Sequence, residues 1–309
     1  MGKRGPRSSI ASLTLLIGLP FASSSLAAPL YLLGSQSPTL GFGIYTVDPQ
    51  TAASTRIVPL GLELRAGYDG LAYRPGDDSA LYTTWSKGVI QGNTIVFQSE
   101  IRRVDLATQA VTTIYTFDPA DVGLTNAFVL NLAIDPLHPN LAVASVFNGD
   151  PSAPLLRAVV TIDLTTGATG PLVSYTAPGS AFSALTYGLD GRLYATNAAT
   201  FGVLNPVTGA YDYNTISLPY PPNSFPLLEG IAYRPTDGAL FGSLGNQTDS
   251  LIRLDPADGT YLETVGPFGI DGPREIVFPF VIPEPSTALL VLGGLITLRA
   301  TQEARRVGM

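Results

Sequence analysis

Residues 70–82 read GLAYRPGDDSALY, and residues 230–241 read GIAYRPTDGALF, which repeats the first stretch almost residue for residue. Weaker copies are NLAIDP at 131–136, followed by LAVASV at 141–146, and LTY at 185–187, followed by DGRLY at 190–194. Each copy reads as a strand, a turn and a second strand, because Pro and Asp-Gly supply the restricted and the positive φ values that a tight turn needs.

A second element follows each copy of the first. It reads YTVDP at 45–49, RVDL at 103–106, TIDLTTG at 161–167, VLNPVTG at 203–209 and RLDPADG at 253–259. Its anchor residues at 48, 105, 163, 205 and 255 are 57, 58, 42 and 50 residues apart. A repeat of roughly 40 to 50 residues, with alternating strands and no helical period, is typical of a β-propeller blade.

The anchor side chains have two interpretations. An Asp or Asn accepts a hydrogen bond from the backbone two residues on and so forms a turn. The alternative is a ladder of metal-binding carboxylates. Because Asn205 and the Asp-Leu copies fit a turn as well as the Asp-Pro copies do, we expect turns.

Together the two elements resemble NHL-like and YVTN-like propeller repeats over most of residues 30–280. We expect three strands within residues 30–60, four full sets of four, and one strand at 275–278, which makes an all-β propeller of five four-stranded blades. The last strand would lie innermost in the blade begun by the N-terminus, and would close the ring without free sheet edges. Six or seven blades would require further strands within 86–98 or 118–130.

The N-terminus has the pattern of a signal peptide. Lys3, Arg4 and Arg7 precede the apolar run at 13–19, and small residues follow at 25–27. The alternative, a membrane anchor, needs roughly 20 apolar residues, more than are present. We expect passage through the Sec translocon and cleavage after Ala27 or Ala28, with Ala27 favoured because the later cut would leave Pro29 first.

Residues 281–309 contain VIPEPST, an apolar segment at 288–298, and a tail with Arg299, Arg305 and Arg306. This order resembles the PEP-CTERM sorting signal of Gram-negative bacteria, although the apolar run contains two glycines and Glu303 interrupts the basic tail. The resemblance implies a short hydrophobic helix that holds a precursor in the inner membrane. An exosortase would then cut near Pro283, Glu284 and Pro285 and leave the protein at the cell surface or in the extracellular matrix. The alternative is an ordinary C-terminal helix packed on the domain.

The expected domains are therefore a signal peptide at 1–27, a propeller at 28–280 and a sorting signal at 281–309. Cysteine is absent, which excludes disulfides, thiolate nucleophiles and Cys-zinc sites. The chain has 17 Lys and Arg against 24 Asp and Glu. Without Lys3, Arg4, Arg7, Arg299, Arg305, Arg306 and Glu303, 11 basic and 23 acidic residues leave a net charge of −12. So acidic a domain argues against a nucleic-acid partner.

Candidate chemistry rests on carboxylates, because the only histidine, His138, lies in an expected exposed turn. Repeat alignment places residues 69, 130, 183, 229 and 274 just before the inner strands, where they would rim one mouth of the channel. Asp69 with Glu229 would there hold a Ca²⁺ ion, which prefers oxygen ligands. The alternative is a solvated rim. Trp85 and Tyr82 would form either part of the core or a sugar-stacking platform.

Three functions follow from these patterns. The first is an exported, non-enzymatic surface or matrix protein that binds envelope polysaccharide, since the sorting signal it resembles belongs to exopolysaccharide producers. The second is a propeller enzyme, either a metal-dependent lactonase-like hydrolase or a polysaccharide lyase, for which the chain has few suitable side chains. The third is a structural spacer.

Overall fold

The structure is a computed structural model of the 309-residue chain. It describes residues 29–35, 41–61, 66–92, 94–149, 156–177, 182–197, 200–219, 227–245 and 248–280. The signal cleavage site at Ala27 and Ala28, the Pro283–Pro285 motif and the expected C-terminal helix lie outside these residues. Among the described residues, no helix is long and apolar enough to cross a membrane.

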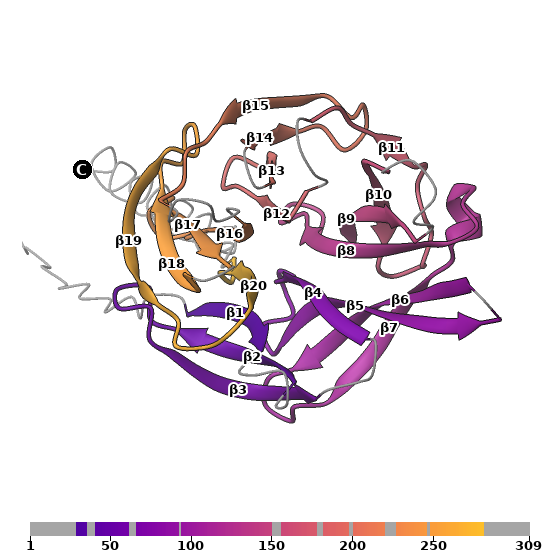
Figure 1. Cartoon of the computed structure of the whole chain (residues 1–309), viewed down its shortest axis with the longest axis horizontal. Coiled ribbons are helices and arrows are strands. Elements are labelled where there is room, and N and C mark those ends of the chain that lie inside the picture. Colours follow the sequence, from indigo (N-terminus) through magenta and orange to yellow (C-terminus); the bar gives the residue numbers. More distant parts are fainter. Residues whose placement is uncertain are drawn as a thin grey trace, which may run out of the picture.

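The described strands form five antiparallel sheets of four strands each, arranged as a ring (Figure 1). Blade 1 contains β20 (Pro273–Val277), β1 (Leu30–Ser35), β2 (Phe42–Val47) and β3 (Ser54–Gly61). Blade 2 contains β4 (Ala66–Ala72), β5 (Ala80–Gln91), β6 (Thr94–Asp105) and β7 (Val111–Phe117). Blade 3 contains β8 (Ala127–Ile134), β9 (Leu141–Asn148), β10 (Ala158–Asp163) and β11 (Val173–Ser174).

Blade 4 contains β12 (Ala184–Tyr187), β13 (Leu193–Thr196), β14 (Thr200–Leu204) and β15 (Tyr211–Thr215). Blade 5 contains β16 (Leu228–Tyr233), β17 (Leu240–Leu244), β18 (Ser250–Leu254) and β19 (Tyr261–Pro267). The first strand of each set, β20, β4, β8, β12 or β16, lies nearest the centre of the ring (Figure 1). The prediction of an all-β, five-bladed propeller is confirmed.

Blade 1 closes the ring with strands from both ends of the described chain. β20 pairs antiparallel with β1, with Tyr31 opposite Val277 and Leu32 opposite Ile276. The predicted closing strand began at residue 275, whereas β20 begins at Pro273, because that residue still pairs with Gly34. The predicted closure is therefore confirmed, with an inner strand that starts two residues earlier.

The two loops that would have held extra blades have other structures. β5 and β6 continue their pairing from Ala80 opposite Asp105 to Gln91 opposite Thr94, so the region at 86–98 is a long hairpin of blade 2. The region at 118–130 contains a short 3₁₀ helix, η1 (Pro119–Val122), and the start of β8. Neither region adds a blade among the described residues.

The five anchor side chains form turns, as predicted. In each case a side-chain oxygen accepts a hydrogen bond from the backbone N–H two residues on, at 2.8 to 3.1 Å; the residues are Asp48, Asp105, Asp163, Asn205 and Asp255. The residue four positions after each anchor has positive φ. It is Gly in three blades, but Ala52 and Gln109 take the same conformation at 61° and 60°.

The core consists of five layers, one between each pair of neighbouring blades. The layer between blades 1 and 2, for example, joins Leu33 and Ile44 to Leu71 and Trp85, all nearly inaccessible to solvent. Tyr82 lies in the layer between blades 2 and 3. Trp85 and Tyr82 are therefore core residues, and the sugar-stacking interpretation of them is excluded by their burial.

Candidate functional site

The rim of one channel mouth is shaped by irregular pairing of the inner strands. In blade 2, Tyr68 pairs with Trp85 and Leu71 pairs with Thr83, so Asp69 and Gly70 together lie opposite a single residue. Such a β-bulge re-aims the side chains of the bulged strand. β8, β16 and β20 have the corresponding irregularity, at residues 130–131, 229 and 274–275.

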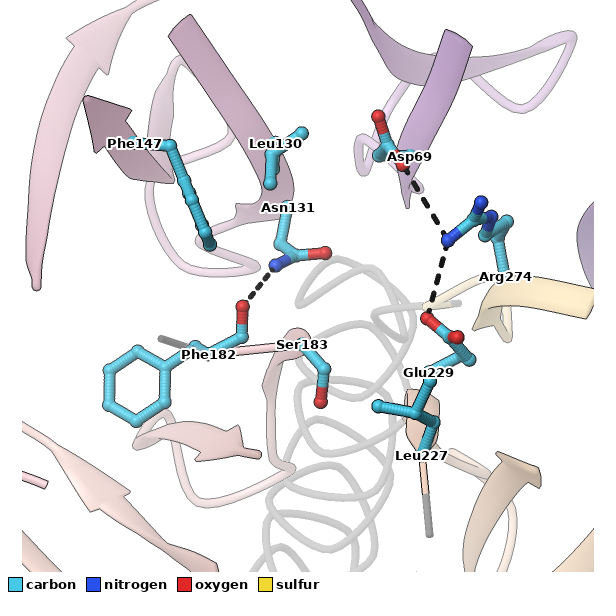
Figure 2. A pocket seen from close by; sticks show the side chains of 9 residues that line it. All are labelled: Asp69, Leu130, Asn131, Phe147, Phe182, Ser183, Leu227, Glu229 and Arg274. Carbon is cyan, nitrogen blue, oxygen red and sulfur yellow. Dashed lines mark hydrogen bonds and ion pairs between the residues drawn. The ribbon is translucent and has the colours of Figure 1, made fainter. Parts of the chain in front are cut away.

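Asp69, Leu130, Asn131, Glu229 and Arg274, which lie in these bulges, line a pocket of about 260 Å³ at this mouth (Figure 2). All five residues predicted for the rim are there. The lining comprises Asp69, Leu130, Asn131, Phe147, Phe182, Ser183, Leu227, Glu229 and Arg274. Repeat alignment therefore located the mouth. It did not find Asn131, Phe147, Phe182 and Leu227, because it gives no information on which neighbours a bulge turns toward the axis.

Arg274 lies between the two carboxylates (Figure 2). Its Nη1 is 4.0 Å from an Asp69 oxygen and 3.6 Å from a Glu229 oxygen, so a blade 1 side chain bridges blades 2 and 5. Both distances exceed the roughly 2.7 to 2.9 Å of a close charge-assisted hydrogen bond. The carboxylates therefore keep the capacity to accept further hydrogen bonds from a ligand.

Burial changes the proton affinity of these carboxyls. Desolvation raises the pKa of Asp69, and the positive charge of Arg274 partly opposes this. The pKa of Glu229 is raised in the same way, with repulsion from Asp69 as a smaller contribution. Both side chains therefore hold a proton more readily than free carboxylates do.

The structure brings Asp69 and Glu229 to one site, but with a guanidinium between them. Ca²⁺ usually takes six to eight oxygen ligands. Among the described residues there is no group of three or more His, Asp or Glu arranged to hold a metal ion. Ca²⁺ at Asp69 and Glu229 therefore stays a prediction, and it would require Arg274 to move away.

Hydrogen bonds at the mouth connect each blade to the next. The Thr84 hydroxyl of blade 2 donates to the Leu130 carbonyl of blade 3. Nδ2 of Asn131 then donates to the Phe182 carbonyl at 2.8 Å, which leads to blade 4. The Ser183 hydroxyl donates to the Leu228 carbonyl in blade 5, and the Ser243 hydroxyl donates to the Arg274 carbonyl in blade 1, both at 2.5 Å. The Arg274–Asp69 ion pair completes the circle, so the mouth is held by all five blades.

Below the rim, the next residue of each inner strand lies close to its neighbours. These residues are Gly70, Asn131, Ala184, Gly230 and Glu275. A Cβ atom at Gly230 would lie 2.8 Å from the Glu275 Cα and 2.7 Å from the Ile276 nitrogen, so this position requires glycine. Glu275 is fully buried. At the far end of the channel the cavity is only about 20 Å³.

His138 lies in a turn away from the mouth. Its side chain is 72% exposed, and Nδ1 is 2.8 Å from an Asp135 oxygen. The prediction of an exposed turn residue is therefore confirmed.

The sequence matches no protein-family model and no curated protein. Among solved structures, the chain is similar in fold to a chain of a nidogen/laminin complex, at 15% identity and a TM-score of 0.47 over 81% of this chain and 98% of that one. It is similar to a Bacteroides caccae protein of unknown function at 10% identity and a TM-score of 0.49, over 81% of this chain and 98% of that one. It is also similar to a periplasmic gluconolactonase of Pseudomonas aeruginosa, at 13% identity and a TM-score of 0.40, over 83% of this chain and 100% of that one. These values carry no inference about ligand or activity. The strand order itself establishes that the chain is a five-bladed β-propeller.

Proposed function

We propose that this chain is an exported binding protein whose propeller holds a carbohydrate at the channel mouth. The observation that carries the proposal is the mixed lining of the mouth pocket. Asp69, Glu229 and Asn131 supply acceptors, Arg274 supplies a donor, and the partly exposed Phe147 supplies apolar surface. A sugar ring presents hydroxyl donors and acceptors around an apolar face, so it matches such a lining.

The size of the pocket favours one unit of a longer chain. At about 260 Å³ it lies just below the roughly 300 to 1,000 Å³ of pockets that enclose a whole ligand. The rest of a polymer would then extend outside the ring. An envelope polysaccharide is the partner that best fits this arrangement and the expected export.

The two faces of the propeller suit a sorted precursor. β20 begins at the mouth, and Phe280, just beyond its end, lines the far cavity with Tyr73 and Tyr187. β1 begins at Leu30, opposite Val47 and next to the Asp48 turn. Both described ends thus lie on the face away from the mouth. A membrane segment after residue 280 would leave the mouth free to bind its ligand.

The test is a glycan array with protein purified from the native host, beside an Arg274→Ala variant and an Asp69→Asn/Glu229→Gln double variant. We expect saturable glycan binding, weakened at least roughly tenfold in each variant, because a site built to hydrogen-bond a ligand suffers when its polar groups are removed. Asp212→Asn, at an exposed position on β15, is the control and should bind normally.

Two results would contradict the proposal. Binding that is unchanged in both mouth variants would place the ligand elsewhere, and an array without any saturable glycan would remove the carbohydrate. Release of shortened or unsaturated products by the parent protein would instead favour the alternative, a hydrolase or lyase. The same samples therefore separate binding from turnover.

A further inference from the structure

The strand that closes the ring contains a buried acid. Glu275 of β20 is 0% exposed, and the corresponding residues of the other inner strands are Gly70, Asn131, Ala184 and Gly230. Glu275 is thus the one ionisable side chain at this level of the channel among the described inner strands. It lies in the blade that joins the two ends of the described chain.

The Glu275 carboxyl reaches across to neighbouring blades but is incompletely paired. Oε1 accepts a hydrogen bond from the Ile231 N–H of blade 5 at 3.1 Å. The backbone N–H groups of Ile231, of Ile276 on the same strand and of Leu185 in blade 4 lower the pKa of the carboxyl, but by less than burial raises it. Oε2 is buried and has no hydrogen-bond partner among the described residues. A buried oxygen without a partner is tolerated far better on a neutral carboxyl than on a carboxylate.

The charges around Glu275 also disfavour its ionisation. Arg274 on the same strand is already placed between two carboxylates. β17 (Leu240–Leu244) contributes no titratable group. The other strands packed against β20 contribute Tyr31 from β1, Tyr68 and Asp69 from β4, and Glu229 and Tyr233 from β16. Burial raises the pKa of Tyr31 and of Tyr233, so both stay neutral. An ionised Glu275 would be repelled by Glu229, the charged side chain that acts on it most strongly.

We propose that Glu275 makes closure of the ring proton-linked: the neutral carboxyl holds blade 1 shut, and its ionisation loosens β20. This goes beyond the proposed function, because it holds whether or not the mouth binds a sugar. The propeller would then be more stable against unfolding in an acidified extracellular matrix than at alkaline pH.

The direction of the linkage follows from burial. Desolvation raises the pKa of Glu275 well above its ordinary value, so the folded chain keeps a proton that the unfolded chain releases. The stabilisation is complete below the ordinary carboxyl pKa, and it falls as pH rises from there to the folded pKa. Within that window one proton changes the folding equilibrium constant tenfold per pH unit.

The first measurement is urea unfolding across pH 5 to 8, with protein purified from the native host and its Glu275→Gln variant. Glutamine keeps the acceptor for Ile231 but cannot ionise. We expect the free energy of unfolding of the variant to depend less steeply on pH, by the contribution of one proton. At pH 8 the variant should be more stable than the parent protein. Asp69→Asn and Glu229→Gln measure how much the two mouth carboxyls contribute to the pH dependence of unfolding. Asp212→Asn is the control, whose pH dependence should equal that of the parent protein.

A second measurement reports on the closing strand itself, and uses the absence of native cysteine. Ser243 contacts β20 through the Arg274 carbonyl, and Ser145 is an equally buried serine in blade 3. The ratio of thiol-labelling rates of Ser243→Cys and Ser145→Cys should rise with pH, and adding Glu275→Gln should abolish the rise. Comparison of two thiols removes the effect of thiol ionisation itself.

Either of two results would overturn the proposal. One is an unchanged pH dependence of unfolding in the glutamine variant. The other is a labelling ratio that stays constant with pH in chains that retain Glu275, and this result decides the matter even if the glutamine variant does not fold.

Discussion

Asp77 shows how one side chain fixes a turn of the propeller. Its carboxylate accepts hydrogen bonds from Arg103 at 2.7 and 2.9 Å and from the Tyr82 hydroxyl at 2.8 Å. The hydrogen-bonded Arg103 guanidinium holds the pKa of Asp77 well below its ordinary value. The arrangement links the turn after β4 to strands β5 and β6 of the same blade.

We expect Asp77→Asn to lower the free energy of unfolding by about 1 to 3 kcal/mol at pH 7, because hydrogen bonds to a charged group are lost. Since the folded pKa is lowered, this stability is present above the ordinary Asp pKa and disappears as pH falls below it. Urea unfolding at pH 7 and pH 3 checks this. An Asp77→Asn effect that is as large at pH 3 as at pH 7 would contradict it. The sign is opposite to that of Glu275.

Two turn glycines separate backbone strain from steric clash. Gly167 and Gly259 follow equivalent anchors with φ of 73° and 77°. A Cβ atom at Gly167 would have no neighbour closer than 3.7 Å, whereas one at Gly259 would lie 2.6 Å from Phe201 atoms. We expect Gly167→Ala to cost about 1 to 2 kcal/mol, from left-handed backbone strain alone, and Gly259→Ala clearly more. Equal thermal destabilisation of the two variants would show that Phe201 yields to the methyl group.

For single residues, the sequence predicted which side chains lie at the mouth but not which of them interact. Repeat alignment placed Asp69, Glu229 and Arg274 at one mouth, because each comes directly before the repeated GLAY-like stretch; the structure places all three inside the inner strands, at the bulges, and not before them as predicted. That Arg274 would bridge the carboxylates depends on bulges in three different blades. Glu275 was missed as a buried acid, since nothing in the repeat indicates that its inner position is free of solvent.

At the element scale, closure by β20 gives a sharp prediction. Truncation before Arg274 removes most of β20 together with Ile276 and Phe278, both 1% exposed. Full burial of each such side chain contributes roughly 1.5 to 3 kcal/mol, a large part of a typical margin of about 5 to 15 kcal/mol. We expect this truncation to unfold at much lower temperature than truncation after Phe280. Equal melting temperatures would contradict closure by β20.

The strands themselves were predictable because the turns are strongly marked. Anchors such as Asp163 and Asn205 fix where the third strand of a blade ends, and the following glycine fixes the return. Strand ends without such marks were less certain. β20 extends to Pro273, and β5 and β6 extend well beyond their blade, because pairing with a partner strand decides both.

At the scale of the whole molecule, the sorting hypothesis predicts the mass of the mature protein. We expect protein from the native host to begin at residue 28 or 29 and to end near Pro285, because both terminal segments would be removed. Glu284→Ala should accumulate as uncut membrane-bound precursor, since it removes the motif's only charged side chain. Intact mass spectrometry of secreted and membrane fractions measures both. Mature protein that retains Met309, or normal processing of the variant, would contradict the hypothesis.

The ring as a whole was predictable because its core repeats. Five layers between neighbouring blades each require apolar residues on both sheet faces, and this requirement produces the repeated GLAY-like strands. The ligand is not fixed by the same repetition. The mouth differs from blade to blade, as the change from Asp69 to Leu130 to Ser183 shows, so its chemistry could only be read after the strands were placed.

The most direct test is a crystal structure of residues 28–280 soaked with an oligosaccharide from the exopolysaccharide of the native host. The account predicts one sugar unit in the mouth pocket, hydrogen-bonded to Asp69 or Glu229 and to Arg274, with the remaining units outside the ring. Sugar bound instead on the opposite face, for example beside Tyr194 and Tyr233 between blades 4 and 5, would contradict the assignment of the mouth as the binding site.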